Sequence, residues 1–292
     1  PVEVLLKGEQ PRALAVSPDG STVYTAFFES GNQTTVIPGN TFHAGGFCSP
    51  QGGCTTIPND VANPAGPYGG VVPVPNAGTG FNPPMNPNNP AMPGNHSLVV
   101  RKNASGQWMD ANGGNWTSIV TGGIAGTART AGWDMPDRDV AHINANSPST
   151  ASVTYTSHLG NILMAMAVHP QSGEVYVVGT DATNEVRFEP NLNGKFLRVN
   201  VSRFAPAGSP TITDLNPHIN YSTHTSPPVL RKQSLGDPRS IVWKADGTKA
   251  YVTGMGSNNI ITITPTGART TPDPIVVRSE ERRVGKECED LC

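Results

Sequence analysis

Short runs of alternating apolar and polar residues, separated by tight turns, recur along the chain. Ala13–Ser17 and Thr22–Phe27 flank a Pro-Asp-Gly turn. Asp-Gly is typical of a hairpin turn, because Gly tolerates the positive φ that such a turn requires. The same arrangement returns at Ala165–Gly179, with Ser-Gly in the turn, and at Pro238–Gly254, with Asp-Gly in the turn. The sequence therefore predicts three copies of one β-hairpin unit.

Repeated units made only of strands are typical of a β-propeller, in which four-stranded blades surround a central axis. We therefore predict an all-β fold, an incomplete β-propeller that forms an open arc of about three to five four-stranded blades. Tyr24, Tyr176 and Tyr251 should occupy equivalent positions in three of these blades. The first blade is predicted within residues 2–37, with strands at Val2–Leu6, Ala13–Ser17, Thr22–Phe28 and Thr34–Ile37.

Two segments depart from this pattern. About half of residues 38–97 are Pro, Gly or Asn, a composition that supports neither a strand ladder nor a helix, so we expect a long irregular insertion there. In residues 278–292, nine of fifteen residues are charged, against 14% in the whole chain, and the segment resembles a translated sequencing adapter. We therefore expect a propeller fragment over residues 1–277 and a non-native tail over residues 278–292.

Charge and hydropathy limit the classes of partner. The formal net charge of −2 argues against a nucleic-acid-binding surface. No apolar run approaches the roughly 18 residues that a membrane-spanning helix needs. The expected partner is another protein or a covalently linked domain.

Two cysteines close together predict a disulfide. Cys48 and Cys54 are separated by five residues rich in Gly and Pro, which can bend back to bring the sulfur atoms together. Two free thiols are the alternative. A disulfide implies an oxidising compartment, and we therefore expect the protein in the bacterial periplasm or outside the cell.

Three carboxylates form the candidate metal site. Asp134, Asp137 and Asp139 lie within six residues, on an acidic turn that enters a predicted strand. Clustered carboxylates on flexible backbone suit Ca²⁺, which binds six to eight oxygen atoms. The alternative is a turn in which Arg138 forms a surface ion pair with a neighbouring aspartate. No other cofactor is expected within the chain.

Further polar candidates lie later in the chain. Glu185, Arg187 and Glu189 alternate on a predicted strand and should point to one face, where they form either a structural salt-bridge ladder or the lining of a central channel. His218 is another candidate for the channel. No Gly-x-Ser-x-Gly elbow or phosphate-binding Gly-rich loop occurs, so no catalytic residue is assigned.

The hairpin motif resembles that of a known family. The pattern Pro-Arg-x-Leu-Ala-Val-Ser-Pro-Asp-Gly-x-x-Val-Tyr at residues 11–24, together with Ala250–Gly254 and Ser257–Ile260, is similar to the YVTN-repeat bacterial β-propellers. The resemblance implies a secreted or surface module that binds or scaffolds. Some larger relatives look like fusions to c-type cytochrome domains, so haem would belong to a domain beyond this chain.

Lactonase-type propellers are also similar, but they usually have His after the Pro-Arg of the motif, where this chain has Ala13 and Ser240. Two functions therefore compete. The first is a non-catalytic periplasmic or secreted binding module, which would be the propeller part of an electron-transfer protein in one setting. The alternative is a propeller lactonase or hydrolase with a site at the channel mouth.

Overall fold

Strands dominate the described part of the chain, where they form three four-stranded sheets, a three-stranded sheet and a two-stranded sheet. The computed structural model describes residues 2–31, 33–37, 47–48, 54–55, 67, 69, 98–110, 113–121, 137–182, 197–206, 208–221 and 226–277.

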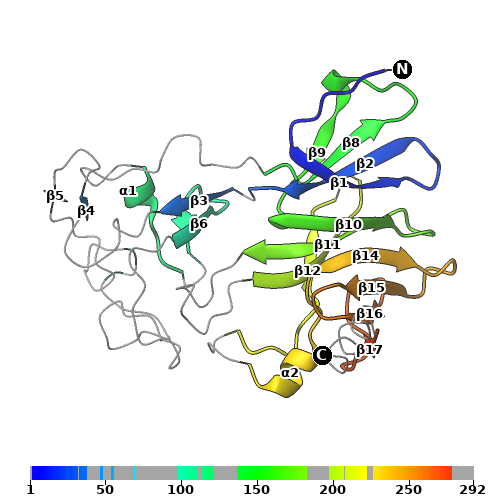
Figure 1. Cartoon of the computed structure of the whole chain (residues 1–292). Helices are drawn as coiled ribbons and strands as arrows, with labels where there is room; N and C mark the ends of the chain where they lie inside the picture. Colours follow the sequence, from blue (N-terminus) through cyan, green and yellow to red (C-terminus); the bar gives the residue numbers. More distant parts are fainter. Residues whose placement is uncertain are drawn as a thin grey trace, which may run out of the picture.

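The three large sheets are antiparallel, and each follows chain order from its first strand to its fourth. The first strands β1, β10 and β14 lie next to one another, and the sheets follow each other like the blades of a fan (Figure 1). The described residues therefore form an all-β, incomplete propeller, an arc of three blades. Blade 1 is β1 (Glu9–Val16), β2 (Thr22–Glu29), β8 (Val140–Asn144) and β9 (Thr154–Thr156); blade 2 is β10 (Ile162–Val168), β11 (Val175–Ala182), β12 (Leu197–Phe204) and β13 (Thr211–Asp214); blade 3 is β14 (Pro238–Trp243), β15 (Ala250–Gly254), β16 (Asn259–Ile263) and β17 (Ile275–Val276).

The predicted equivalence of the hairpins is confirmed residue by residue. Tyr24, Tyr176 and Tyr251 each lie on the second strand of a blade. All three first strands carry a β-bulge at the same place, so the bulge is a regular part of the repeating unit and not a local irregularity. The turns also agree, because each holds a glycine at positive φ. The bulges lie at Pro11/Ala13, Leu163/Ala165 and Pro238/Ser240, and the turn glycines are Gly20 (φ +71°), Gly173 (φ +74°) and Gly247 (φ +67°).

The prediction for the outer strands of blade 1 was wrong. Residues 2–6 are not a strand, and Thr34–Ile37 forms β3, which pairs with β6 (Leu98–Lys102) outside the blade. The third strand is instead β8, which pairs with Thr22–Ala26 of β2. Residues 30–139, called the insertion from here on and longer than the predicted 38–97, thus separate the second strand of the blade from the third. A local alternation of residues identifies a strand but carries no information about its partner.

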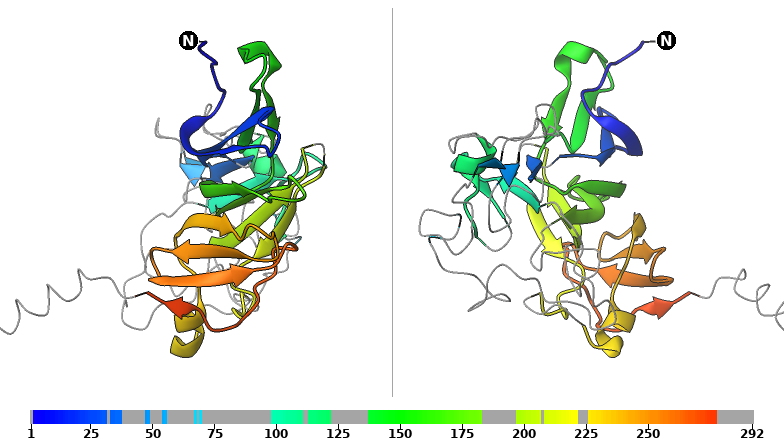
Figure 2. Two further views of the ribbon diagram at one scale, coloured as in Figure 1. Left: turned by 90° about the vertical axis from the view of Figure 1, so that its right-hand side faces the viewer. Right: turned by 60° about the vertical axis from the view of Figure 1, so that its left-hand side comes forward.

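The insertion contains small elements of its own. The strand β6 pairs with β7 (Trp108–Met109) as well as with β3, and α1 (Thr117–Val120) follows. Trp116 is fully buried, and its indole N–H donates to Asp110 at 2.9 Å. This part lies to one side of the three blades (Figures 1 and 2). Two-residue strands, β4 (Phe47–Cys48) and β5 (Cys54–Thr55), pair with each other.

The core lies between the blades. Tyr24 and Ala26 of blade 1 belong to a cluster with Val175 and Val177 of blade 2. At the second interface, Tyr176 of blade 2 packs edge-on against Trp243 of blade 3, with ring centroids 4.7 Å apart. A second short helix, α2 (Pro228–Gln233), precedes blade 3. Among the described residues, no helix has the length and apolar character that a bilayer crossing requires.

Candidate functional site

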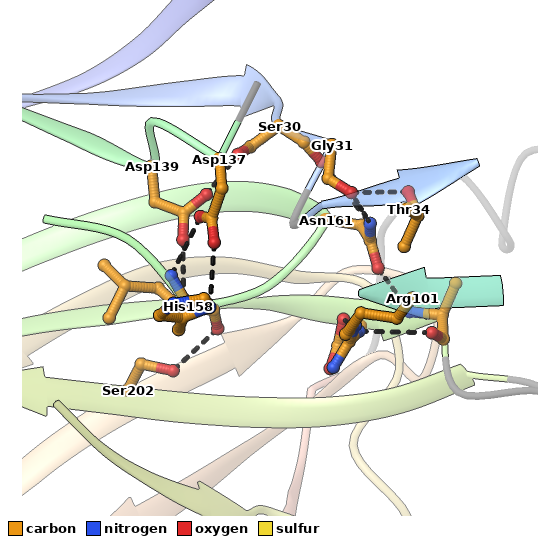
Figure 3. Close-up of polar contacts among 12 residues, drawn as sticks. Ser30, Gly31, Thr34, Arg101, Asp137, Asp139, His158, Asn161 and Ser202 are labelled. Atoms are coloured by element: carbon orange, nitrogen blue, oxygen red, sulfur yellow. Dashed lines mark hydrogen bonds and ion pairs between the residues drawn. The ribbon is translucent and has the colours of Figure 1, made fainter. Parts of the chain in front are cut away.

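A buried polar cluster joins blade 1 to blade 2 at the end of β2 (Figure 3). Ser30 directly follows β2, whereas Asp137 and Asp139 directly precede β8. His158 and Leu159 lie in the connection between β9 and β10. Three chain segments that are far apart in sequence therefore meet at one junction, on the side from which the insertion leaves blade 1.

Asp139 is the centre of this cluster. Its side chain is fully buried, accepts a hydrogen bond from the hydroxyl of Ser30, and accepts another from the backbone N–H of Leu159 at 2.5 Å. Burial, and to a smaller extent the nearby charge of Asp137, raise the pKa of Asp139 to about 8. At neutral pH the Asp139 carboxyl group is therefore predominantly protonated.

Asp137 holds the connection between the two blades. Its Oδ1 atom accepts from the backbone N–H of His158 at 2.9 Å, and its Oδ2 atom lies 2.8 Å from Nδ1 of His158. The backbone carbonyl of Asp137 accepts from the hydroxyl of Ser157 at 2.6 Å. His158 has a φ of +66°, an uncommon conformation for a residue other than glycine. The contacts to Asp137 explain how the chain keeps this conformation.

A second group of contacts extends the junction into the insertion. The guanidinium group of Arg101, from β6, forms an ion pair with the carboxylate of Asp181, at the end of β11. The amide group of Asn161 accepts from the backbone N–H of Ala182 at 2.8 Å, and the backbone N–H of Asn161 donates to Thr180. The insertion is therefore attached to blade 2 as well as to blade 1, from which it emerges.

The predicted calcium ligands are only partly described. Asp137 and Asp139 are brought together as the sequence suggested, whereas Asp134 lies outside the described residues. In the described part of the chain, no group of three or more His, Cys, Asp or Glu side chains could hold a metal ion. Both described aspartates already bind protein donors. Calcium at this place remains a prediction that depends on Asp134.

His218 lies in a different environment from the aspartate pair. Its Nε2 atom lies 3.0 Å from the carbonyl oxygen of Leu230 and 3.1 Å from the hydroxyl of Ser234, both next to or within α2. Burial lowers the pKa of His218. The structure thus places this imidazole in the contact with α2. The other predicted channel residues, Glu185, Arg187 and Glu189, lie outside the described residues.

The two cysteines face each other in the backbone register. Cys48 of β4 is the direct cross-strand partner of Cys54 of β5. Directly opposed residues of an antiparallel pair have Cα atoms about 4.5 to 5.5 Å apart, within the range that a disulfide spans. The positions of the sulfur atoms lie outside what the structure describes, so the disulfide remains a prediction.

A polar pocket lies at the opposite end of β2 from the aspartate cluster. At its wall, the ring of His142 stacks on Phe204 and meets Tyr24 edge-on, and its Nε2 atom lies 2.8 Å from the hydroxyl of Thr156. Burial lowers the pKa of His142, so the imidazole is neutral at physiological pH. None of the described lining residues carries a carboxylate or a thiol. They are Ser21, Thr22, Tyr24, His142, Asn144, Asn146, Ser152, Thr154 and Pro206.

Sequence reasoning missed most members of the aspartate cluster. Ser30 lies 109 residues before Asp139, and Arg101 lies 80 residues before Asp181. Nothing in the local pattern around Ser30 or Arg101 indicates such a contact. His158 follows a short strand, and a histidine at positive φ cannot be read from the sequence. Only the proximity of Asp137 to Asp139 gave a usable signal.

No family model and no curated protein matches the sequence. Among solved structures, hydrazine synthase of Kuenenia stuttgartiensis is similar over 90% of this chain and 66% of that chain, with 14% identity and a TM-score of 0.35. A periplasmic gluconolactonase of Pseudomonas aeruginosa is similar over 92% of this chain and 58% of that chain, with 12% identity and a TM-score of 0.32. The chain thus spans less than two thirds of the length of either protein. The assignment of blades rests on the strand order and register.

Proposed function

We propose that this chain is a non-catalytic propeller module that binds or positions a partner protein or a covalently linked domain, in the bacterial periplasm or outside the cell. The observation that carries the proposal is the role of the polar groups at the aspartate cluster. They are buried in contacts that hold two blades and the insertion together. Their arrangement favours a structural role, in which they attach the insertion to the blades, over a catalytic role on a small substrate.

A general acid or base must reach the proton that it transfers, within about 3 Å or through one water molecule. Asp139 is fully buried, and both of its oxygen atoms accept hydrogen bonds from protein donors. The side chain of Asp137 is only 3% exposed and is directed to His158. The raised pKa of Asp139 therefore results from the burial of its carboxyl group between two blades and does not indicate a catalytic role.

The polar pocket gives little support to the lactonase alternative. Hydrolysis of a lactone needs a group that activates water and a group that stabilises the developing oxyanion. The described lining offers a neutral imidazole, His142, which is already bonded to Thr156 and stacked on Phe204. This ring serves the packing between blades 1 and 2.

The insertion is the part of the chain best placed to contact a partner. Its strands leave blade 1 at Gly31 and contact blade 2 through the Arg101–Asp181 ion pair, and the small sheet lies beside the blades (Figure 2). On this sheet Lys102 is exposed, and its ammonium group lies 5.5 Å from the ring centroid of Trp108. The resemblance to YVTN-repeat propellers favours the same kind of role.

A hydrolysis assay separates the two functions. The full chain is incubated with a panel of five- and six-membered lactones, with and without Ca²⁺, and acid release is followed by pH-stat titration. We expect rates equal to those of buffer alone. Turnover that is lost in His142→Ala or Asp139→Asn would establish the lactonase alternative and reject the non-catalytic role.

The binding role needs a separate measurement. A photoreactive amino acid is placed at Lys102 on the insertion, or at Lys244 on the turn at the far end of blade 3 as a matched control, because both side chains are exposed lysines. In periplasmic extract of a bacterium that carries the gene, we expect one defined adduct from position 102 and none from position 244. Equal labelling from both positions would contradict binding through the insertion.

A further inference from the structure

One kind of interface is used twice within the arc. Each blade has a tyrosine face, defined in blade 1 by Ala13, Ala15, Tyr24 and Ala26, and an opposite face, defined by the residues that alternate with these. The tyrosine face of blade 1 packs on the opposite face of blade 2, and the tyrosine face of blade 2 packs on the opposite face of blade 3. The contacting positions correspond one to one. On the tyrosine face of blade 2 they are Ala165, Ala167, Tyr176 and Val178; on the opposite faces they are Met166, Val168, Val175 and Val177 in blade 2, and Ile241, Trp243, Ala250 and Val252 in blade 3.

Blade 1 presents an opposite face that no described blade covers. Leu14 and Val16 are 71% and 53% exposed. They occupy the positions at which blade 2 has Met166, 8% exposed, and Val168. The segment before β1 leaves these two side chains open, because it follows β9 instead, where the backbone N–H of Lys7 donates to the hydroxyl of Tyr155.

Blade 3 presents the complementary surface, an uncovered tyrosine face. Val242 is 58% exposed, although the equivalent alanines of blades 1 and 2 belong to the interblade core. Tyr251 is only half-buried, whereas Tyr24 and Tyr176 are 1% and 0% exposed. The same face is hollowed beside Thr253 and Ile260, which pair across the strands β15 and β16.

These two surfaces are different from each other and complementary. Exposed apolar side chains grouped on one face of a sheet mark an interaction surface. A contact between two unlike patches is heterologous, and it closes into a ring when the rotation between copies permits. Here the tyrosine face of blade 3 would pack on the opposite face of blade 1 of another copy. This contact repeats the interface that already joins blade 1 to blade 2 and blade 2 to blade 3. A second copy of this chain carries both surfaces, so each surface of one copy can be covered by the complementary surface of the other.

The number of blades limits how many copies can take part. The described residues form three blades, and closed propellers typically have about four to eight. Two copies supply six blades, whereas three copies would supply nine. We propose that a second copy of this chain docks head to tail on the arc, so that Leu14 and Val16 of each copy cover Val242 and Tyr251 of the other, and that the pair closes into a six-bladed ring.

The test is the oligomeric state of the full chain, measured by sedimentation velocity over a range of concentrations. A chain of 30.6 kDa should form a species of about 61 kDa. Leu14→Asp and Val242→Asp, which lie on different faces, should each weaken the dimer by about tenfold or more, because a charge would enter a desolvated contact. Ile212→Asp is the matched control: Ile212 is 45% exposed on β13 and lies outside both surfaces.

Each other result overturns the proposal. A monomer at every concentration shows that no second copy docks, and would leave the two faces to further blades of another chain. A dimer that withstands Leu14→Asp and Val242→Asp uses a different surface. Species that grow beyond the dimer show a head-to-tail contact that does not close. Circular dichroism of the variants confirms that they are folded, which is expected because all three positions are exposed in the monomer.

Discussion

The carboxyl groups of Asp137 and Asp139 hold consecutive residues at the junction of blades 1 and 2, because Asp137 accepts from the backbone N–H of His158 and Asp139 accepts from that of Leu159. Burial raises the pKa of Asp139 to about 8, from an ordinary value of 3.8. The folded protein therefore takes up a proton that the unfolded chain releases over a wide range of pH. Stability and protonation are linked at this junction.

The first prediction concerns the pH dependence of unfolding. Between about pH 4 and pH 8 the folded state holds one more proton at Asp139 than the unfolded state, so this group stabilises fully below pH 4 and its contribution is lost as pH rises to 8. The free energy of unfolding should fall over this range by up to about 1.4 kcal/mol per pH unit. Urea denaturation of the full chain at a series of pH values measures the slope.

Asp139→Asn is the variant that isolates this contribution. The amide can accept from Leu159, but it does not titrate. We expect a flatter pH profile for Asp139→Asn and a gain in relative stability at pH 8. Asp246→Asn on an exposed turn serves as the control, because binding to Lys244 lowers the pKa of Asp246 instead of raising it. An unchanged slope in Asp139→Asn would contradict the assignment.

The second prediction is that Ser30→Ala lowers the free energy of unfolding more than Ser21→Ala, a substitution at an exposed turn, does. Ser30 is 4% exposed, and its hydroxyl donates to the buried Asp139. Loss of a donor to a buried carboxyl group costs about 1–3 kcal/mol. Ser21→Ala removes a hydroxyl that donates to Asp19 at an exposed turn, and we expect a change below about 0.5 kcal/mol. If Ser30→Ala and Ser21→Ala lower the free energy of unfolding equally in urea denaturation, the hydrogen bond of Ser30 does not stabilise the junction between blades 1 and 2.

The third prediction separates the insertion from the blades. Arg101→Ala removes the ion pair to Asp181 and should loosen the contact of the small sheet with blade 2, while the interblade core stays intact. Limited proteolysis should then cleave between β2 and β8 at least severalfold faster, with little change in the cleavage of blade 3. Lys102→Ala is the control on the same strand. Faster cleavage throughout the chain would instead indicate a general loss of stability.

The sequence revealed those features of the fold that depend on local chemistry. The turns at Gly20, Gly173 and Gly247 need a residue that tolerates positive φ, and this requirement is visible in the motif. The partner of β2 was not predictable, because β8 lies more than 100 residues away and a strand pattern does not name its neighbour. The aspartate cluster was hidden for the same reason, since Ser30 and His158 contribute from distant segments.

The last prediction concerns the pair Cys48 and Cys54, which are cross-strand partners in β4 and β5. A directly opposed pair meets the Cα separation of a disulfide, so oxidised protein should yield a linked peptide on non-reducing digestion and mass spectrometry. A loop this short constrains the unfolded chain modestly, and reduction should lower stability by no more than about 2 kcal/mol. Because Cys288 and Cys292 also carry thiols, the experiment uses a chain in which both are Ser. In that background Cys54→Ser should expose one reactive thiol at Cys48, whereas two reactive thiols in the parent would show that the disulfide does not form.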